Sequence, residues 1–287
     1  MKIVLAVDGS KYSTWATQWI ARLPLTSKPQ VTAVHVLDLA ALRAPFMVQP
    51  VVIGNEPFIL AETKRLEDRA RKVKAETTDL LASLELEGKV LSLQGAVAPT
   101  ILKRIPGRNS LAVVGHRGLD ALDRFMLGSV STYVIHHAPC SVLVVKQPSR
   151  TIRRIVLAVD GSKASERGLA FLLEHLRPRD IQPNGTEVAI EVAVTHVMPF
   201  IRYPEVKETS KALVHYHAER LEKTGYRVEE VARLGHPADE IIKVSERQKT
   251  DLIVAGARGL GAVGRFFLGS VTTKLLHHST CSVLVAR

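Results

Sequence analysis

One stretch of this sequence occurs twice. Residues Ile3–Lys11 read IVLAVDGSK, and residues Ile155–Lys163 read the same letters again. A longer match follows in the same order, in which Gly115–Val145 resembles Gly256–Ala286. Two long matches in one order indicate that a single domain has been duplicated.

The length of the chain agrees with a duplication. A chain of 287 residues exceeds the roughly 100–200 residues of an ordinary domain. We predict two domains, residues 1–147 and 152–287, which meet at a seam around Lys146–Arg153 where a proline and basic residues interrupt the pattern. Each domain is long enough to bury its own core without disulfides or metals.

Within each copy, short β-branched runs alternate with helical patterns such as Ser13–Leu23 and Glu62–Leu86. The runs are Ile3–Val7, Val31–Leu37, Val90–Leu93, Leu111–Val114 and Val142–Val145 in the first copy, and Ile155–Val159, Val188–Val197, Val228–Leu234, Leu252–Ala255 and Val283–Ala286 in the second. Such runs are typical of strands buried on both faces. The alternation predicts an α/β fold of two Rossmann-like domains, each a five-stranded parallel sheet flanked by helices, with ligands at the carboxyl ends of the strands.

The first copy carries extra residues after its second strand. The offset between the copies falls from 161 at His35 and His196 to 141 at Gly115 and Gly256. The insertion lies within 37–64 and mixes prolines with apolar residues. A lid or contact surface and a loop folded onto its own domain are equally consistent with this composition.

Charge and hydropathy narrow the class of protein. The chain is 46% hydrophobic and 23% charged, as in globular proteins. No apolar run approaches the roughly 20 residues needed to cross a bilayer, and the first run meets Asp8 too early for a signal peptide. The net charge of +11 is spread along the chain, with only 5% aromatic residues, which favours phosphate ligands over nucleic acid. We expect a cytoplasmic protein with no membrane or nucleic-acid partner.

The cysteines, Cys140 and Cys281, each precede the letters SVLV at the start of a predicted strand. We expect two free, buried thiols, with a disulfide as the alternative.

Each copy also contains a glycine motif of the form G-x2-G-x9-G-S between a predicted strand and a predicted helix. Its residues are Gly115, Gly118, Gly128 and Ser129 in the first copy and Gly256, Gly259, Gly269 and Ser270 in the second. Glycines let a backbone approach an anion closely, and a helix N-terminus offers unpaired N–H groups and partial positive charge. Ser131 and Thr272 add hydroxyls two residues later. The alternative is that the glycines serve turns and the serines are ordinary N-caps, but the repetition favours phosphate binding.

Two other phosphate motifs do not apply. Gly259, Gly261 and Gly264 spell G-x-G-x-x-G, but they follow the fourth predicted strand rather than the first, and the first copy has Asp120 and Asp123 at the matching positions. No G-x4-G-K-[ST] occurs in the sequence.

Three motifs together resemble the universal stress protein family. They are the strand-ending V-D-G-S, the G-x2-G-x9-G-S spacing and the H-x-P-C-x-V-L-V that ends the first copy. The resemblance covers both copies and is to the tandem-domain members. The second copy departs from it at Ser279 and Thr280, and the first has Gly95-Ala96-Val97 where Gly235-His236-Pro237 is the more typical form.

The resemblance implies the ATP-binding class of that family, with the glycine-motif residues, Ser131 and Thr272 around the phosphates and ribose. It also implies that Asp8 and Asp160 lie beside the ribose and adenine, with helix N-capping as the other role of an aspartate there. The backbone of Val36 and Val197 would hydrogen-bond the adenine edge.

Several residues near the motif have less specific interpretations. Arg117 and Arg258 agree between the copies, as do Arg124 and Arg265, and we expect solvated side chains rather than phosphate contacts. Adjacent histidines, His136-His137 and His277-His278, suggest a metal, but neighbours on a helix point about 100° apart, which favours packing.

Three functions remain to be weighed. The leading one is a nucleotide-dependent regulator in the stress response that binds ATP, with Mg²⁺, at one site per domain. The alternative is a slow ATP hydrolase, which needs groups that orient water and stabilise the developing charge; nothing fixes Lys11 or Lys163 at the γ-phosphate, so whether the protein is an enzyme stays open. Nucleic-acid binding depends on charge alone. The resemblance further implies an intramolecular pseudo-dimer about a local two-fold axis and allows a homodimer.

Overall fold

One sheet runs through both copies of the repeat. The computed structural model describes residues 1–39, 56–118, 127–148, 151–181, 185–199, 204–259 and 268–287. The strands of the first half are β1 (Lys2–Ala6), β2 (Gln30–Leu37), β3 (Gly88–Gln94), β4 (Ser110–Gly115) and β5 (Ser141–Val145). Their counterparts in the second half are β6 (Arg154–Ala158), β9 (Glu191–Met198), β10 (Arg227–Leu234), β11 (Leu252–Gly256) and β12 (Ser282–Ala286).

The strand order confirms the predicted α/β fold. The sheet has ten strands in the order β10-β9-β6-β11-β12-β5-β4-β1-β2-β3. All pairs inside each half are parallel, so each half is a five-stranded parallel sheet. At the centre β5 pairs with β12 in antiparallel fashion, with Leu143 opposite Leu284.

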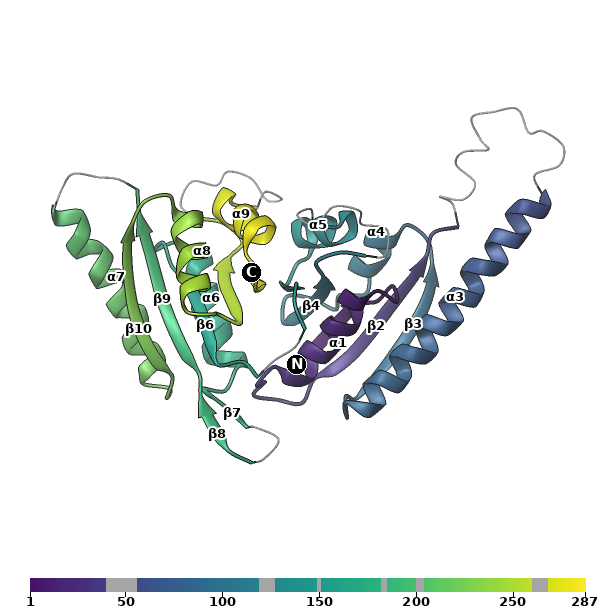
Figure 1. The fold of residues 1–287 in the computed structure, drawn as a ribbon, viewed down its shortest axis with the longest axis horizontal. Helices are drawn as coiled ribbons and strands as arrows, with labels where there is room; N and C mark the ends of the chain where they lie inside the picture. The colour runs from purple at the N-terminus through teal and green to yellow at the C-terminus, as the bar shows by residue number, and fades with distance from the viewer. Residues whose placement is uncertain (40–55, 119–126, 149–150, 182–184, 200–203, 260–267) are drawn as a thin grey trace.

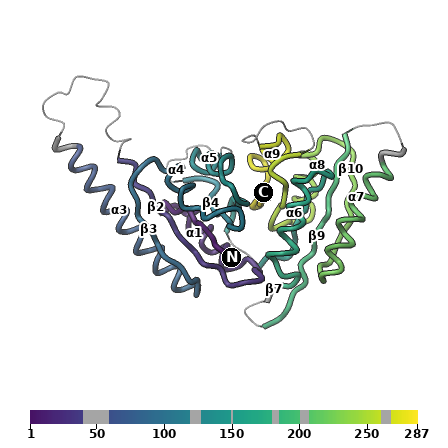
Figure 2. The backbone as a smooth tube through the Cα atoms, turned by 180° about the vertical axis from the view of Figure 1, so that it is seen from behind, coloured from purple at the N-terminus to yellow at the C-terminus, as the bar shows by residue number. Residues whose placement is uncertain are grey.

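Helices flank the sheet in both halves, and both chain termini lie near the junction of the halves (Figure 1). The helices are α1 (Lys11–Arg22), α3 (Glu56–Ser83), α4 (Val97–Leu102), α5 (Ser129–His137), α6 (Lys163–His175), α7 (Pro204–Glu222), α8 (Pro237–Arg247) and α9 (Ser270–His278). Helices α3 and α7 lie at the two outer edges, and α5 and α9 lie on either side of the junction, as the view from behind also shows (Figure 2).

The central strands are mostly apolar because both faces of the sheet are covered there, whereas the outermost strands β3 and β10 carry polar and charged residues and are largely exposed. In β1, Ile3 and Leu5 belong to the cluster that contains Trp19 of α1. Val4, on the opposite face, belongs to a second cluster with Ile135 of α5. The alternation follows from the two-residue period of a strand.

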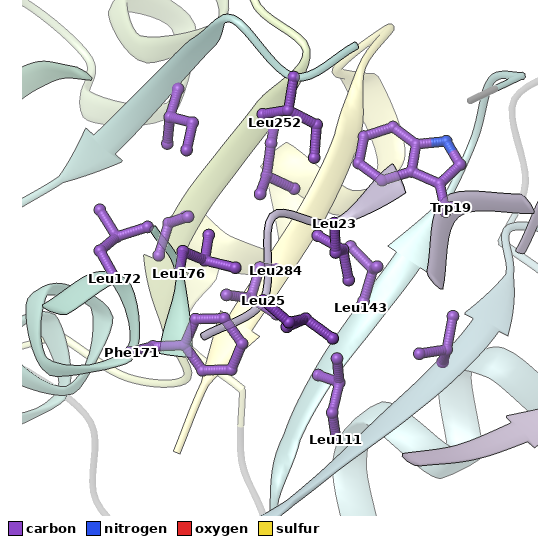
Figure 3. Packing of buried hydrophobic residues seen from close by; sticks show 14 of the residues in the cluster. Trp19, Leu23, Leu25, Leu111, Leu143, Phe171, Leu172, Leu176, Leu252 and Leu284 are labelled. Carbon is purple, nitrogen blue, oxygen red and sulfur yellow. The ribbon is translucent and has the colours of Figure 1, made fainter. Parts of the chain in front are cut away.

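The buried core is continuous across the two halves. Leu25, which follows α1, forms an isolated antiparallel bridge with Leu176, which follows α6. Both leucines are buried and lie in one cluster with Phe171, Leu143 and Leu284. Figure 3 shows this cluster as it passes from one half to the other. The halves therefore share apolar surface as well as a sheet.

One predicted strand is divided in the structure. We predicted a single strand over Val188–Val197, whereas β8 (Glu187–Ala189) ends before Ile190 and β9 begins at Glu191. Ile190 is fully buried, and its N–H donates to the carbonyl of Pro178 at 2.9 Å. β8 instead pairs with β7 (Arg179–Ile181) in a hairpin that periodicity did not predict.

The insertion of the first copy lies mostly outside the described residues. Residues 40–55 are not described, so whether they form a lid or a contact surface stays a prediction. From Glu56 the chain is already helical, earlier than the predicted start at Glu62. No helix in the described residues is both long and apolar enough to span a membrane.

Candidate functional site

Two cavities lie at the carboxyl ends of the strands, one in each half. The first has a volume of about 670 Å³ and the second about 490 Å³. In each half the strand order reverses beside the first strand (β1 or β6), the position where open α/β sheets bind ligands. All of the predicted site residues line these cavities: Asp8, Val36, Gly115, Gly118, Gly128, Ser129 and Ser131 in the first, and Asp160, Val197, Gly256, Gly259, Gly269, Ser270 and Thr272 in the second.

The aspartates after β1 and β6 are not helix N-caps. Ser10 caps α1 and Ser162 caps α6, because their side chains accept hydrogen bonds from the N–H groups three residues later. Asp8 Oδ1 accepts from the N–H of Ser10 at 2.9 Å, and Asp160 Oδ1 accepts from that of Ser162 at 3.0 Å. Each carboxylate is thus held in a turn at the floor of its cavity.

Gly118 and Gly259 let these carboxylates approach the glycine loop. A Cβ added at Gly118 would lie 2.7 Å from Asp8 Oδ2, and one at Gly259 would lie 2.6 Å from Asp160 Oδ2. Real Cβ atoms essentially never come so close to another atom. These glycines therefore let each carboxylate lie close to the glycine loop, and a side chain at either position would displace it.

Gly115 and Gly256 are also explained by packing. A Cβ at Gly115 would lie 2.7 Å from the Cβ of Tyr12, and one at Gly256 would lie 2.5 Å from the carbonyl carbon of Ala164. These contacts let α1 and α6 lie close against the ends of β4 and β11. The absence of a side chain here does not by itself indicate a ligand.

The hydroxyls of Ser131 and Thr272 tie the helices to the glycine loops. Ser131 Oγ donates to the carbonyl of Gly115 at 2.6 Å, and Thr272 Oγ1 donates to that of Gly256 at 2.7 Å. Each hydroxyl proton is used inside the protein, so the oxygen faces its cavity mainly as an acceptor.

Gly128 and Gly269 differ from the other glycines of the motif. They are the N-caps of α5 and α9, with φ of −61° and −65°, which any residue can adopt. Among the described residues, the nearest atom to a Cβ at either position would lie at 3.4 Å, close to ordinary van der Waals contact. In the part of the chain that the structure describes, neither backbone conformation nor packing requires glycine at these two positions.

The N-terminal turns of α5 and α9 face the cavities without a side-chain cap among the described residues. Ser129 and Ser270 are the first helical residues, so the alternative that they are N-caps is wrong. The first N–H groups of a helix have no acceptor within it and carry partial positive charge. An anion at this end of either cavity would meet both.

The backbone of Val36 faces the first cavity beyond the end of β1. The N–H of Val7 donates to the carbonyl of Val34 at 3.0 Å, and the N–H of Gly95 donates to that of Leu37 at 3.0 Å on the other side of β2. Because backbone groups alternate along a strand, those of Val36 point to the β1 side, where β1 has already ended at Ala6.

The second half repeats this arrangement. The N–H of Val159 donates to the carbonyl of Thr195 at 2.9 Å, and that of Gly235 donates to the carbonyl of Met198 at 2.9 Å on the far side of β9. By the same alternation, the N–H and C=O of Val197 point past the end of β6 toward the second cavity. A donor and an acceptor side by side at a cavity wall match the edge of a purine or pyrimidine base.

The apolar walls of the cavities were not predicted from the sequence. Ile101 of α4 and Leu127 line the first cavity, and Ile241 of α8 and Leu268 line the second. The short amphipathic helix after the third strand of each half was the signal that could have revealed them, since its inward face must cover the sheet beside the site.

The two cavities differ where the outer helices approach them. Leu66 and Arg69 of α3 line the first cavity, together with His35. His35 Nδ1 lies 2.9 Å from the carbonyl of Val7. In the second half, His196 Nδ1 instead contacts Ser210 Oγ of α7 at 2.7 Å, and burial lowers the pKa of His196 although Asp160 opposes the shift.

Two residues between the glycines of the first motif are buried. Arg117 is only 7% exposed, so the expectation of a solvated side chain is wrong there, whereas its counterpart Arg258 is half-buried. Burial, and then the positive charges of Lys146 and Arg117, lowers the pKa of His116 to about 4, which leaves the imidazole neutral at pH 7. Arg124 and Arg265 lie outside the described residues.

The remaining candidates have packing roles in the described structure. The His136 and His137 rings lie 6.4 Å apart, and His137 stacks on Tyr133 at 4.0 Å. Across the described residues, no group of three His, Cys, Asp or Glu could hold a metal ion. The Lys11 ammonium lies over the ring of Tyr12 at 5.3 Å. Both cysteines are free and buried, as predicted.

The fold and the paired cavities define a tandem α/β protein with a candidate ligand site in each Rossmann-like half. The universal stress protein family matches residues 1–146 and 151–287, and the chain belongs to that family. A universal stress protein of Mycolicibacterium smegmatis is 27% identical over 300 residues, which cover 99% of this chain and 96% of the relative. Universal stress protein Rv2005c of Mycobacterium tuberculosis is 27% identical over 295 residues, with the same coverage.

The architecture also resembles a solved structure. The crystal structure of a universal stress protein from Archaeoglobus fulgidus matches with a TM-score of 0.67 and 19% identity. The match covers 100% of this chain and 98% of the other, so the similarity of fold extends over both halves.

Proposed function

We propose that each half binds an adenine nucleotide, ATP with Mg²⁺, and that occupancy of the two sites regulates the protein during the stress response. The proposal concerns binding rather than turnover. Volumes of about 670 and 490 Å³ fall within the range of small-molecule sites.

The observation that carries the proposal is the bare N-cap of α5 and α9. Gly128 and Gly269 occupy positions where serine or aspartate would stabilise the helix. Neither the backbone conformation nor the packing of the described residues requires glycine there. An anion that contacts the exposed N–H groups would explain why both caps lack a side chain.

The other residues fit the remaining parts of the nucleotide. The backbone of Val36 or Val197 would pair with the adenine edge, and the apolar walls at Ile101 or Ile241 would cover its faces. Asp8 and Asp160, at the floor, would accept from the ribose hydroxyls. Mg²⁺ would enter with the phosphates, because it is usually held by substrate phosphates and few protein ligands.

The pairing of β5 with β12 supports a pseudo-dimer of the proposed domains, 1–147 and 152–287. Val142 lies opposite Val285 and Val144 opposite Val283. The repeat relates Val142 to Val283 and Val144 to Val285, so exchanging the halves reproduces the same pairs. We place a local two-fold axis at Leu143 and Leu284. The free thiols and the use of ATP support a cytoplasmic location.

Mass spectrometry of the ligand released from gently purified protein tests the proposal. We expect an adenine nucleotide that approaches two molecules per chain, and added ATP should raise the melting temperature of stripped protein. If neither is observed, the proposed function is wrong. Turnover above trace that disappears on combining Gly128→Asp with Gly269→Asp would instead assign an ATP hydrolase.

A further inference from the structure

The residue that follows the last strand of each half reaches into the opposite half. Lys146 follows β5, and Arg287 stands at the equivalent position after β12. The backbone N–H of Lys146 donates to Ser282 Oγ at 3.3 Å, and that of Arg287 donates to Ser141 Oγ at 3.2 Å. The two contacts are equivalent, and each crosses the junction.

Their side chains end at the C-termini of the helices across the junction. Lys146 Nζ donates to the Ser279 carbonyl at 2.7 Å, to Ser279 Oγ at 3.0 Å and to the Leu275 carbonyl at 3.2 Å, at the end of α9. Arg287 Nη2 donates to the carbonyls of Ile135 and His136, at the end of α5. The last carbonyls of a helix lack partners within it and attract cations.

The opposite ends of the same helices form the candidate anion sites. Helix α5 begins at Ser129 in the first cavity, and α9 begins at Ser270 in the second. Each helix has nine residues, a length of about 13 Å. A short rigid helix therefore joins each cavity to a cation supplied by the other half.

The glycine loop of the first cavity makes a further contact across the junction. His116, between Gly115 and Gly118, lies against the backbone of Leu276 in the last turn of α9, near Lys146 and His277. The counterpart of His116 in the second half is Ala257. The end of α9 thus touches both Lys146 and the loop of the first cavity.

We propose that Lys146 and Arg287 are positioning residues that act across the junction. Lys146, in the first half, holds α9, whose first turn binds the anion of the second cavity. Arg287, in the second half, holds α5, whose first turn binds the anion of the first cavity. Nucleotide affinity in one half then depends on the other half. This proposal deepens the proposed function of the two cavities and rests on it for the identity of the ligand, but not for the mechanical role of the two cations.

The binding test isolates each cavity in the full chain. Gly128→Asp blocks the first cavity and Gly269→Asp the second, and calorimetric titration with ATP and Mg²⁺ then reports on the cavity that remains. Adding Lys146→Met to Gly128→Asp is expected to weaken the second cavity about 3–10-fold, and adding Arg287→Met to Gly269→Asp to weaken the first by a similar factor.

Conservative variants and a distant lysine serve as controls. Lys146→Arg places at this position the cation that the equivalent position already uses, so it should keep binding within about twofold of the parent. Lys223→Met removes an exposed lysine that directly follows α7 and should change neither cavity. Equal binding by Lys146→Met and its parent overturns the proposal. So does a loss in the first cavity, measured by adding Lys146→Met to Gly269→Asp, when the second cavity keeps its affinity.

Amide exchange tests the same role without any nucleotide. The Thr273 N–H closes the first turn of α9 by donating to the Gly269 carbonyl at 2.9 Å, and the Thr132 N–H does the same for α5 with Gly128 at 2.8 Å. Measured by NMR, exchange at Thr273 should accelerate about threefold or more in Lys146→Met while Thr132 is unchanged, and Arg287→Met should give the reverse.

ATP titration and amide exchange together distinguish failure of the proposed nucleotide binding from failure of the proposed positioning role. If the unmutated chain binds no ATP, the proposed function fails, and the exchange rates still decide the role of the cations. If both amides accelerate equally, or neither does, Lys146 and Arg287 only stabilise the fold, and the positioning role is wrong.

Discussion

The three glycines of each motif differ in what their missing side chain makes room for. Gly115 allows α1 to pack against β4 and Gly118 allows Asp8 Oδ2 to approach, whereas no contact with the described residues requires glycine at position 128. From the sequence they form one motif, because their spacing does not show which atoms a Cβ at each position would meet. Only the third glycine is left for a ligand to explain.

Gly128→Asp separates binding from stability. Aspartate is at least as good an N-cap as glycine, so the melting temperature of ligand-free protein should stay the same or rise slightly. The carboxylate would occupy the anion end of the first cavity, and ATP affinity there should fall more than about 100-fold. Thermal melts with and without ATP measure both effects, and a stable variant with normal ATP affinity in the first cavity would remove Gly128 from the site.

The pKa of Lys146 predicts a pH dependence of stability. Burial, more than the nearby charge of Arg117, lowers this pKa to about 8, below the value of about 10.4 in an unfolded chain. Between these values the unfolded chain binds more protons, so the contribution of Lys146 to the free energy of unfolding rises with pH, by at most about 1.4 kcal/mol per pH unit.

Chemical denaturation at several pH values between 8 and 10 checks this. Relative to Lys146→Met, the unmutated chain should gain stability as the pH rises, while Lys223→Met should keep a constant difference. If the stability of the unmutated chain relative to Lys146→Met stays constant or falls as the pH rises, the lowered pKa is contradicted.

At the level of elements, the first helix of each half is fixed by its cap. Ser10 and Ser162 hold the first turns of α1 and α6, and the aspartates two residues earlier hold the preceding turns. The motif DGS thus gives a strand end, a turn at a glycine with φ of +79° or +77°, and a helix start. Because the motif occurs in both halves, the same turn follows the first strand at both cavities.

Ser162→Ala should therefore destabilise the second half without filling its cavity. Loss of an N-cap of this kind costs about 1 kcal/mol of unfolding free energy. Urea denaturation measures it, and Ser162→Asp, which can still cap, is the matched control. No loss of stability in Ser162→Ala would indicate that α6 is held by packing alone.

The repeat predicted most elements because the inner strands are apolar on both faces and each helix has its own period. The hairpin β7–β8 was missed because its three-residue strands are too short to show a period. The rise in offset from 152 at Asp8 and Asp160 to 161 at His35 and His196 marks this insertion in the second copy. How the helices lie over the cavities depends on tertiary packing. For this reason the sequence could not predict that Ile101 and Ile241 line them.

On the scale of the whole molecule, the halves share a sheet and a core. β5 and β12 are entirely buried, and the Leu25–Leu176 bridge adds apolar contact between segments far apart in sequence. The sequence predicted that the halves resemble each other. It did not predict the reciprocal contacts of Lys146 and Arg287, because a basic residue after a strand is usually exposed to solvent. The partial burial of these two cations depends on the assembled junction.

A shared core predicts cooperative unfolding. Calorimetry of the unmutated chain should give one transition, because neither half keeps its core when the other unfolds. Leu25→Asp buries an unpaired charge at the junction and should destabilise the chain by about 3 kcal/mol or more, separating the transitions of the two halves. Leu60→Asp, on an exposed leucine of α3, is the control and should leave one transition.

The stoichiometry of nucleotide binding tests the central claim most directly. Native mass spectrometry of stripped protein with ATP and Mg²⁺ should find two nucleotides per unmutated chain, one in Gly128→Asp, one in Gly269→Asp and none in the double variant. Two nucleotides retained by the folded double variant would contradict the account, because ATP would then bind somewhere other than the N-termini of α5 and α9.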